Sequence, residues 1–217
     1  MRDDIRDSTK SGRENATEAT ESSIDGYFTD PFTKQERSEI RSIRLPKLVE
    51  AKLVQEASSK GMSVSALIYS ILDRHVNWES AAQKFGFLTL PGETLSIGLD
   101  HLDSNTVMEI ARIAGTTVPK QLILFLFDEV TPSAFLKWVD FMSRYERLAD
   151  WKVERTGDMV VMTGHHQMES NWTTWIASYM EAAVRSTLNV LPEVEQDDGT
   201  VRIRFDLAKA SKSRASQ

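Results

Sequence analysis

The stretch IRSIRLPKLVEAKLVQEASSKGMSVSALIYSILDRHVNW, residues 40–78, decides how the N-terminal part of this chain folds. Within its first six residues, Ile43 and Leu45 share one face of an extended segment, and Ser42 and Arg44 share the other. This period of two predicts a short strand. Pro46 ends the strand, because proline lacks the amide that a sheet ladder needs and suits the first turn of a helix.

Two helices are expected after this strand. In the first, Val49, Leu53 and Ala57 recur every four residues, and Gly61 supplies the helix stop. Ser63 is a suitable N-cap for the second helix. The apolar stripe of the second helix consists of Val64, Leu67, Ile68, Ile71, Leu72 and His75. We expect His75 to be a packed or half-exposed helix residue rather than a ligand.

A block of this size does not fold as a single copy. Its one strand has no partner, and two short helices bury too little apolar surface. The simplest remedy is a second copy of the chain, whose strand pairs antiparallel with the first. Four helices then pack beneath the two-stranded ribbon, and the outer face of the ribbon presents Ser42 and Arg44 twice about a two-fold axis. The sequence therefore predicts an obligate homodimer.

The order RSIRLP, VEAKLVQEA and KGMSVSALIYSIL resembles the ribbon-helix-helix family of DNA-binding proteins, over residues 40–78 only. The resemblance implies a ribbon that enters the major groove of double-stranded DNA and reads base edges with outward strand residues. In this sequence those residues are Ser42 and Arg44, with Ile40 at the preceding outward position. Ile40 departs from the polar type common there and offers only an apolar contact.

Contacts to the DNA backbone are expected from three further residues. Arg41 stands where the family often has an apolar residue; it either reaches a phosphate or marks the frayed start of the strand. The family also anchors a phosphate on the N-terminus of the second helix, here near Ser63 and Ser65. Two simpler interpretations stay open: Arg44 as a solvated strand charge, and Ser63 as a helix cap alone.

Charge is distributed unevenly along the 217 residues, whose formal net charge is −6. Residues 36–78 hold seven Lys/Arg and five Asp/Glu, whereas residues 79–207 hold eleven and nineteen. An acidic chain argues weakly against nucleic-acid binding. A block that stays basic beside an acidic one restores that possibility, because screening makes local charge matter more than the sum.

Composition excludes several classes of protein. The chain has no cysteine, which rules out a disulfide scaffold, a cysteine nucleophile, an iron–sulfur cluster and a thiolate zinc site. No run of 18 apolar residues occurs, and the polar N-terminus has no secretory h-region. We therefore expect a cytoplasmic protein without a membrane partner.

The predicted organisation has four parts and an α+β fold class. Residues 1–35 are polar and are expected to form a disordered tail, and residues 208–217 a flexible basic tail. Residues 36–78 form the ribbon-helix-helix domain (β-α-α) for DNA binding and dimerisation. Residues 79–207 form a separate α+β domain of order α-α-α-β-β-α-β-β with an antiparallel sheet. Its expected elements are helices 104–114, 118–129 and 131–148, strands 151–155 and 159–163, helix 171–188, and strands 193–195 and 201–205.

One cluster in the second domain has chemical potential. Two histidines and an acid, His165, His166 and Glu169, follow the second predicted strand, and such groups can hold a divalent metal. Adjacent histidines on a strand point to opposite faces, so an ordinary loop is the preferred interpretation. The family includes nickel-responsive repressors, but their sites use several histidines and a cysteine. We predict no catalytic residue, no metal and no cofactor.

The predicted function is a homodimeric, sequence-specific transcription regulator, which can assemble into higher oligomers on DNA. The domain at 79–207 then adds oligomer contacts, senses a small molecule or recruits a protein. One alternative is an antitoxin of the same family, whose C-terminal part wraps a protein partner. The other is an enzyme with a site near His165, His166 and Glu169, in which the N-terminal block only dimerises.

Overall fold

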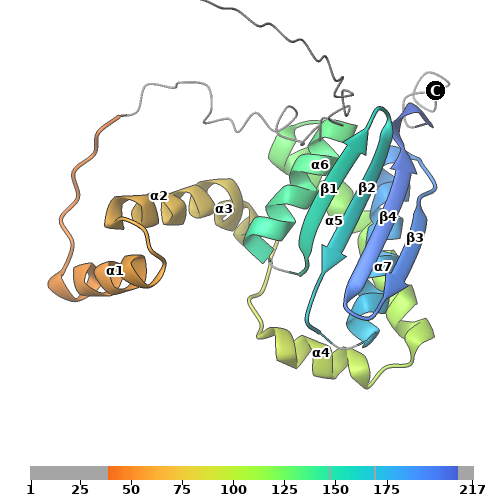
Figure 1. Ribbon diagram of the computed structural model, residues 1–217, viewed down its shortest axis with the longest axis horizontal. Helices are drawn as coiled ribbons and strands as arrows, with labels where there is room; N and C mark the ends of the chain where they lie inside the picture. Colours follow the sequence, from red (N-terminus) through yellow and green to blue (C-terminus); the bar gives the residue numbers. More distant parts are fainter. Residues whose placement is uncertain (1–38, 147, 169, 210–217) are drawn as a thin grey trace, which may run out of the picture.

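The structure, a computed structural model, describes residues 39–146, 148–168 and 170–209 (Figure 1). Over these residues it has seven α-helices, two short π-helical segments and one four-stranded antiparallel sheet. The mixed α+β class is therefore confirmed. The predicted tail 1–35 and residues 210–217 of the predicted basic tail lie outside the described residues.

The two N-terminal helices begin and end close to where the sequence predicts. Helix α1 (Lys47–Ser59) starts directly after Pro46, and helix α2 (Val64–Arg74) starts directly after Ser63. Between them Gly61 has a φ of 64°, a left-handed conformation that costs little only for glycine. The predicted turn between the helices is thus present.

Helix α2 does not end near Trp78. It continues through a π-helical segment, η2 (His75–Glu79), into helix α3 (Ser80–Lys84), and Figure 1 shows these elements as one arm that leads to the body of the molecule. The predicted domain boundary at residues 78 and 79 therefore falls inside a continuous helical segment. The predicted apolar stripe of the second helix stops at His75 and does not indicate that the helix continues.

Residues 39–46 form neither helix nor strand in the single chain. The strand predicted at 40–45 is thus not formed here, for a simple reason: a strand needs a hydrogen-bonded neighbour, and the predicted neighbour belongs to a second copy. The two-stranded ribbon between copies stays a prediction.

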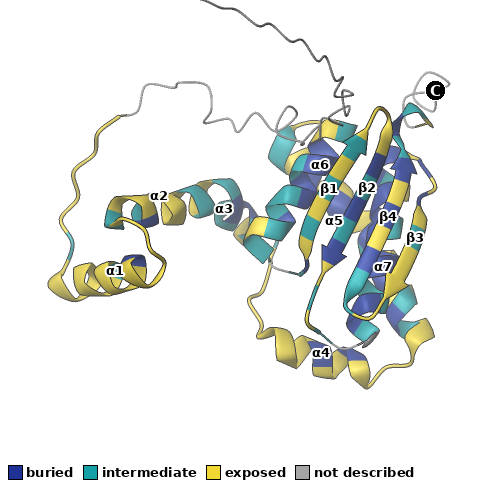
Figure 2. Cartoon of the chain, in the orientation of Figure 1, coloured by how far each residue is buried: buried dark blue, intermediate teal, exposed yellow. Residues whose placement is uncertain are grey.

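The sheet consists of two antiparallel hairpins, both at the predicted positions. Strands β1 (Asp150–Thr156) and β2 (Met159–His165) form one hairpin, and β3 (Glu193–Asp197) and β4 (Thr200–Asp206) form the other, in the spatial order β1-β2-β4-β3. Residues along β2 and β4 alternate between buried and less buried positions (Figure 2). One face of the sheet therefore packs on the core, and the other carries charged side chains such as Lys152, Arg202 and Arg204.

Helices α5, α6 and α7 lie behind the sheet in Figure 1. Helix α7 (Ser170–Leu188), predicted from residue 171, contacts both α5 and the second hairpin. Helix α6 (Pro132–Phe141) is capped by Thr131, whose hydroxyl accepts from the Ala134 amide at 3.1 Å, and continues into η3 (Met142–Glu146). Its rings join the sheet to α7, since Phe135 contacts Phe205 and Trp138 contacts Tyr179. These residues belong to a single hydrophobic core.

The helices that precede α6 differ from the prediction in two ways. A short helix that we did not predict, α4 (Gly92–Asp100), comes first. The two helices predicted at 104–114 and 118–129 are then one helix, α5 (Ser104–Phe127), whose N-cap is Asp103 rather than a residue of 104–106. The order α-α-α-β-β-α-β-β holds when α3 is counted with the N-terminal arm, but its first two helices are not the ones predicted.

Helix α5 runs through Pro119 because a neighbouring helix compensates for the missing amide. Proline cannot donate to the carbonyl four residues earlier, which here belongs to Gly115. The hydroxyl of Ser186 on α7 donates to that carbonyl oxygen at 3.3 Å. A proline that reads as a helix start in the sequence therefore lies buried in the middle of a helix.

Gly115 also marks the closest approach of α5 and α7. A Cβ placed on Gly115 would lie 2.2 Å from the carbonyl oxygen of Tyr179 and 3.0 Å from the Cβ of Ala182. Only glycine permits this contact between two helix backbones, so α5 and α7 are held together along one side of α5.

By length and composition alone, α5 is also long and apolar enough to cross a membrane, and 28% of its most apolar 18-residue segment is buried. Core helices of water-soluble proteins meet the same criterion. The charged residues Glu109, Arg112 and Lys120 interrupt its apolar sequence, which is why the sequence shows no uninterrupted apolar run.

Candidate nucleic-acid interface

The predicted reading residues lie on an extended segment that is open to solvent. Ile40 is 94% exposed, and Ser42 and Arg44 are exposed as well. Arg41 pairs with Glu39 at 2.7 Å between Nη2 and Oε2, and both side chains are largely exposed. The segment thus offers two arginines and a serine, and a second molecule can reach them without displacing any described part of the chain.

The helices behind this segment cover each other incompletely. In α1 only Ala57 is buried, and in α2 only Leu67. The remaining members of the two predicted stripes are half-buried or exposed; Leu72, for example, is 57% exposed. Ile43, on the inward face of the predicted strand, is also exposed. A single chain therefore leaves much of the predicted core of this block in water.

The N-terminus of α2 has the geometry expected of a capped helix start. The Ser63 hydroxyl accepts from the Ala66 amide at 3.1 Å, which confirms Ser63 as the N-cap. Ser65 is exposed in the first turn of the same helix. Helix starts carry amides without intrahelical partners and a partial positive charge, so this end suits an anion. A phosphate at this position is still a prediction.

The sequence did not indicate how the helical arm is fastened to the rest of the molecule. The Tyr145 hydroxyl, on η3, donates to Oδ2 of Asp73 at 2.8 Å. Arg74 donates to the carbonyl oxygen of Tyr145 at 3.2 Å and pairs with Glu79 at 3.0 Å. Trp78 stacks on the ring of Tyr145, with 6.1 Å between centroids. Burial and the Asp73 carboxylate together raise the pKa of Tyr145 to about 12, so its hydroxyl is a permanent donor at neutral pH.

The two histidines at the end of β2, His165 and His166, have different hydrogen-bond partners. His165 is exposed and lies 3.1 Å from the Thr200 hydroxyl, whereas the half-buried His166 accepts from the Met168 amide and lies 3.1 Å from the Thr173 hydroxyl. Burial is the main cause that lowers the pKa of His166. Glu169 lies outside the described residues. Within the described part of the chain, no three His, Asp or Glu side chains are grouped as a metal site would require.

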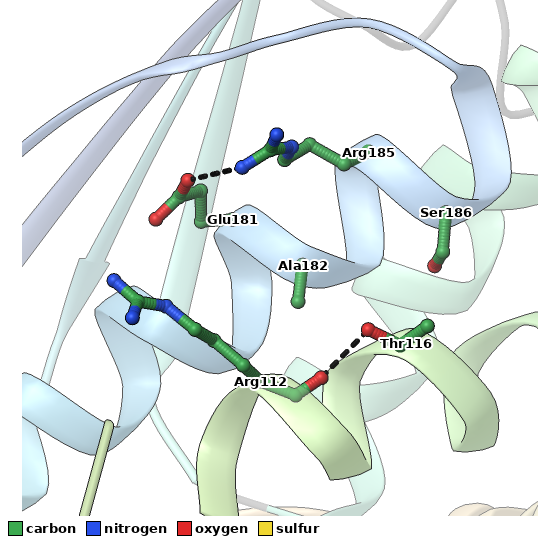
Figure 3. Close-up of a pocket in the computed structure, with 6 residues that line it drawn as sticks. All are labelled: Arg112, Thr116, Glu181, Ala182, Arg185 and Ser186. Atoms are coloured by element: carbon green, nitrogen blue, oxygen red, sulfur yellow. Dashed lines mark hydrogen bonds and ion pairs between the residues drawn. The ribbon is translucent and has the colours of Figure 1, made fainter. Parts of the chain in front are cut away.

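A shallow groove lies between α5 and α7 (Figure 3). Its volume is about 270 Å³, and its lining residues are Arg112, Thr116, Glu181, Ala182, Arg185 and Ser186. Glu181 pairs with Arg185 at 3.2 Å, and the hydroxyls of Thr116 and Ser186 donate to backbone carbonyls. The groove therefore offers little unsatisfied polarity to a ligand, apart from the exposed guanidinium of Arg112.

Comparison of the chain with protein-family models finds no match, and comparison with curated protein sequences finds none either.

Proposed function

We propose that the protein is a homodimeric, sequence-specific DNA-binding transcription regulator of the ribbon-helix-helix type. The observation that carries this proposal is the exposed segment at residues 40–45 with two helices behind it whose apolar sides are uncovered. A second copy would pair with the segment and cover both helices at once. The C-terminal unit then serves regulation or oligomerisation.

Each candidate residue has a distinct role in this proposal. Arg44 on the outer face of the ribbon makes a bidentate contact with guanine, and Ser42 contacts a neighbouring base edge. Ile40 lies beside them and makes an apolar contact. Arg41 and the α2 N-terminus near Ser63 and Ser65 hold phosphates and so fix the register of the ribbon on the duplex. The Arg41–Glu39 ion pair is exposed and weak, so it opens at little cost.

The build of the C-terminal unit favours a regulator over an antitoxin. It has a core of its own that includes Trp138, Val160 and Met180, all fully buried. A segment that wraps a protein partner gains its order on binding and seldom carries such a core. A folded unit that contacts the DNA-binding block through Tyr145 suits the sensing or assembly functions of a regulator.

The experiment begins with DNA from the genome that encodes the protein, which is captured on the full-length chain and sequenced to give the operator. Binding of the operator and of random DNA is then measured by fluorescence anisotropy for wild type, Arg44→Ala and Ser63→Ala. Arg44→Ala should lose about 1–3 kcal/mol per base contact on the operator and little on random DNA. Ser63→Ala should weaken both alike, because a phosphate contact carries no sequence information.

Lys152→Ala is the matched control, since it removes one positive charge from the open face of the sheet and should change neither affinity. Equal losses on operator and random DNA for Arg44→Ala would contradict its role as a reading residue. If no DNA is enriched on the full-length chain, the proposed function itself is wrong.

A further inference from the structure

The outer face of α5 is apolar and uncovered. Ile110, Ile113 and Leu124 are 44%, 63% and 53% exposed. At 100° per residue, Thr117 and Gln121 lie on the same face, and both are exposed. We call these five residues the α5 stripe. Such a face on a long helix needs a partner, or the helix would present it to water at a cost in solubility.

The charges beside the α5 stripe have a specific arrangement. Glu109 and Lys120 lie along the same edge of the stripe, since eleven residues correspond to almost three whole turns. Neither forms an ion pair with any described residue. One is acidic and the other basic, and they lie at equal distances, about 8 Å, from a point between Ala114 and Gly115.

We propose that the α5 stripe is covered by the same stripe of a second copy of this chain, with the two helices antiparallel. The two-fold axis passes beside the point between Ala114 and Gly115. In this arrangement Glu109 faces Lys120 of the second copy, and the symmetry repeats the pair on the other side. The two Ile113 side chains meet near the axis, and Ile110 packs against Thr117 of the second copy.

The charges beside the stripe favour a second copy over other occupants. Under a two-fold rotation each Glu109 meets Lys120 of the other copy, so both charges of each copy are paired. A lipid surface would use the apolar residues but would leave the paired spacing of the charges without a purpose.

The inference uses only residues of α5 and does not depend on DNA binding by the N-terminal block. Because the chain has no cysteine, single cysteines report on it directly. In full-length Ile113→Cys the two positions lie about 5 Å apart along the helices, on either side of the axis, and the thiols should form an intermolecular disulfide under mild oxidation. In full-length Gln121→Cys, on the same exposed side of α5, the two positions are about 20 Å apart along the helices, beyond the reach of a disulfide.

Charge exchange tests the register. In the Ile113→Cys background, Glu109→Lys or Lys120→Glu places like charges opposite each other and should lower the cross-linked fraction about fivefold at limiting protein concentration. The double exchange Glu109→Lys/Lys120→Glu should restore it. Circular dichroism melting of each variant confirms that the chain is folded.

The outcomes are distinct. No disulfide in Ile113→Cys, or equal yields in Ile113→Cys and Gln121→Cys, would overturn the antiparallel contact. Binding to phosphatidylcholine–phosphatidylglycerol vesicles that Ile113→Glu abolishes, without cross-linking, would assign the stripe to a membrane instead. A cross-link in a protein that enriches no DNA would leave the α5 contact intact and reject the proposed function alone.

Discussion

Glu146 at the end of η3 gives the most direct test of the energetics of this fold. Its Oε1 atom is enclosed and has no hydrogen-bond partner among the described residues. Burial raises the pKa of Glu146 from 4.5 to about 7. An unpaired carboxylate in such a place disfavours its own ionised form, because removing a charge from water is costly when nothing compensates for it.

The sign of the effect follows from the two pKa values. Below pH 4.5 the carboxyl is protonated in both the folded and the unfolded chain, and it adds no pH dependence. Between pH 4.5 and about 7 the unfolded chain releases the proton and the folded chain keeps it, so the free energy of unfolding falls as pH rises. A shift of this size corresponds to about 3 kcal/mol, at about 1.4 kcal/mol per pKa unit.

Glu146→Gln should abolish this loss, because glutamine has nearly the same shape and no titration. Urea unfolding of both proteins, followed by tryptophan fluorescence at pH 5, 6, 7 and 8 and one protein concentration, measures it. As pH rises from 5 to 8, the free energy of unfolding of the variant should increase relative to that of the wild type, by up to about 3 kcal/mol. Gln121→Ala removes an exposed side chain that does not titrate, so this control should differ from wild type equally at every pH. A flat difference for Glu146→Gln would refute the reasoning.

Three further predictions concern single contacts. Gly115→Ala should destabilise the chain by about 2 kcal/mol, because the new methyl would collide with the Tyr179 carbonyl, whereas Gly98→Ala, with open space around it, should be neutral or stabilising. Tyr145→Phe should cost about 1 kcal/mol in the wild type and much less in an Asp73→Asn background, as a double-mutant cycle by urea unfolding would show. Ser63→Ala removes the cap of α2 and should lower the free energy of unfolding by about 1 kcal/mol, whereas Ser65→Ala should leave it unchanged.

The parts of the fold that the sequence predicted well are those that local physics decides. The turn at Gly61 and the cap at Ser63 each depend on one residue's backbone preference or one hydroxyl. Both hairpins follow from alternation on either side of a glycine turn. The α5 helix was predicted as two because Pro119 is a strong local break signal, and its compensation comes from Ser186, 67 residues away. No local pattern carries that information.

The candidate interface likewise has features that the local sequence predicts and features that depend on distant residues. The exposure of Ile40, Ser42 and Arg44 follows from the lack of a strand partner, since the inward residue Ile43 is exposed as well. The fastening of the arm could not be predicted, since Asp73 and Tyr145 are 72 residues apart and both look like ordinary surface polar groups in the sequence. Helix α4 was missed because Gly92 and Gly98 weaken its helical signal. Its last turn is instead held by Asn171, which donates to the carbonyl oxygens of Leu99 and Leu102.

The two proposed contacts between copies, the ribbon at 40–45 and the α5 stripe, constrain each other through the arm. Both are isologous, so they join the same two chains only if their two-fold axes coincide. The arm transmits the orientation of one axis to the other, because α2 continues into α3, Tyr145 holds Asp73, and Phe85 packs on Phe125 of α5 with 5.0 Å between ring centroids. If the axes coincide, the assembly closes as a dimer. If they differ, each contact recruits a different copy, and the assembly grows to a tetramer or a longer array along the DNA.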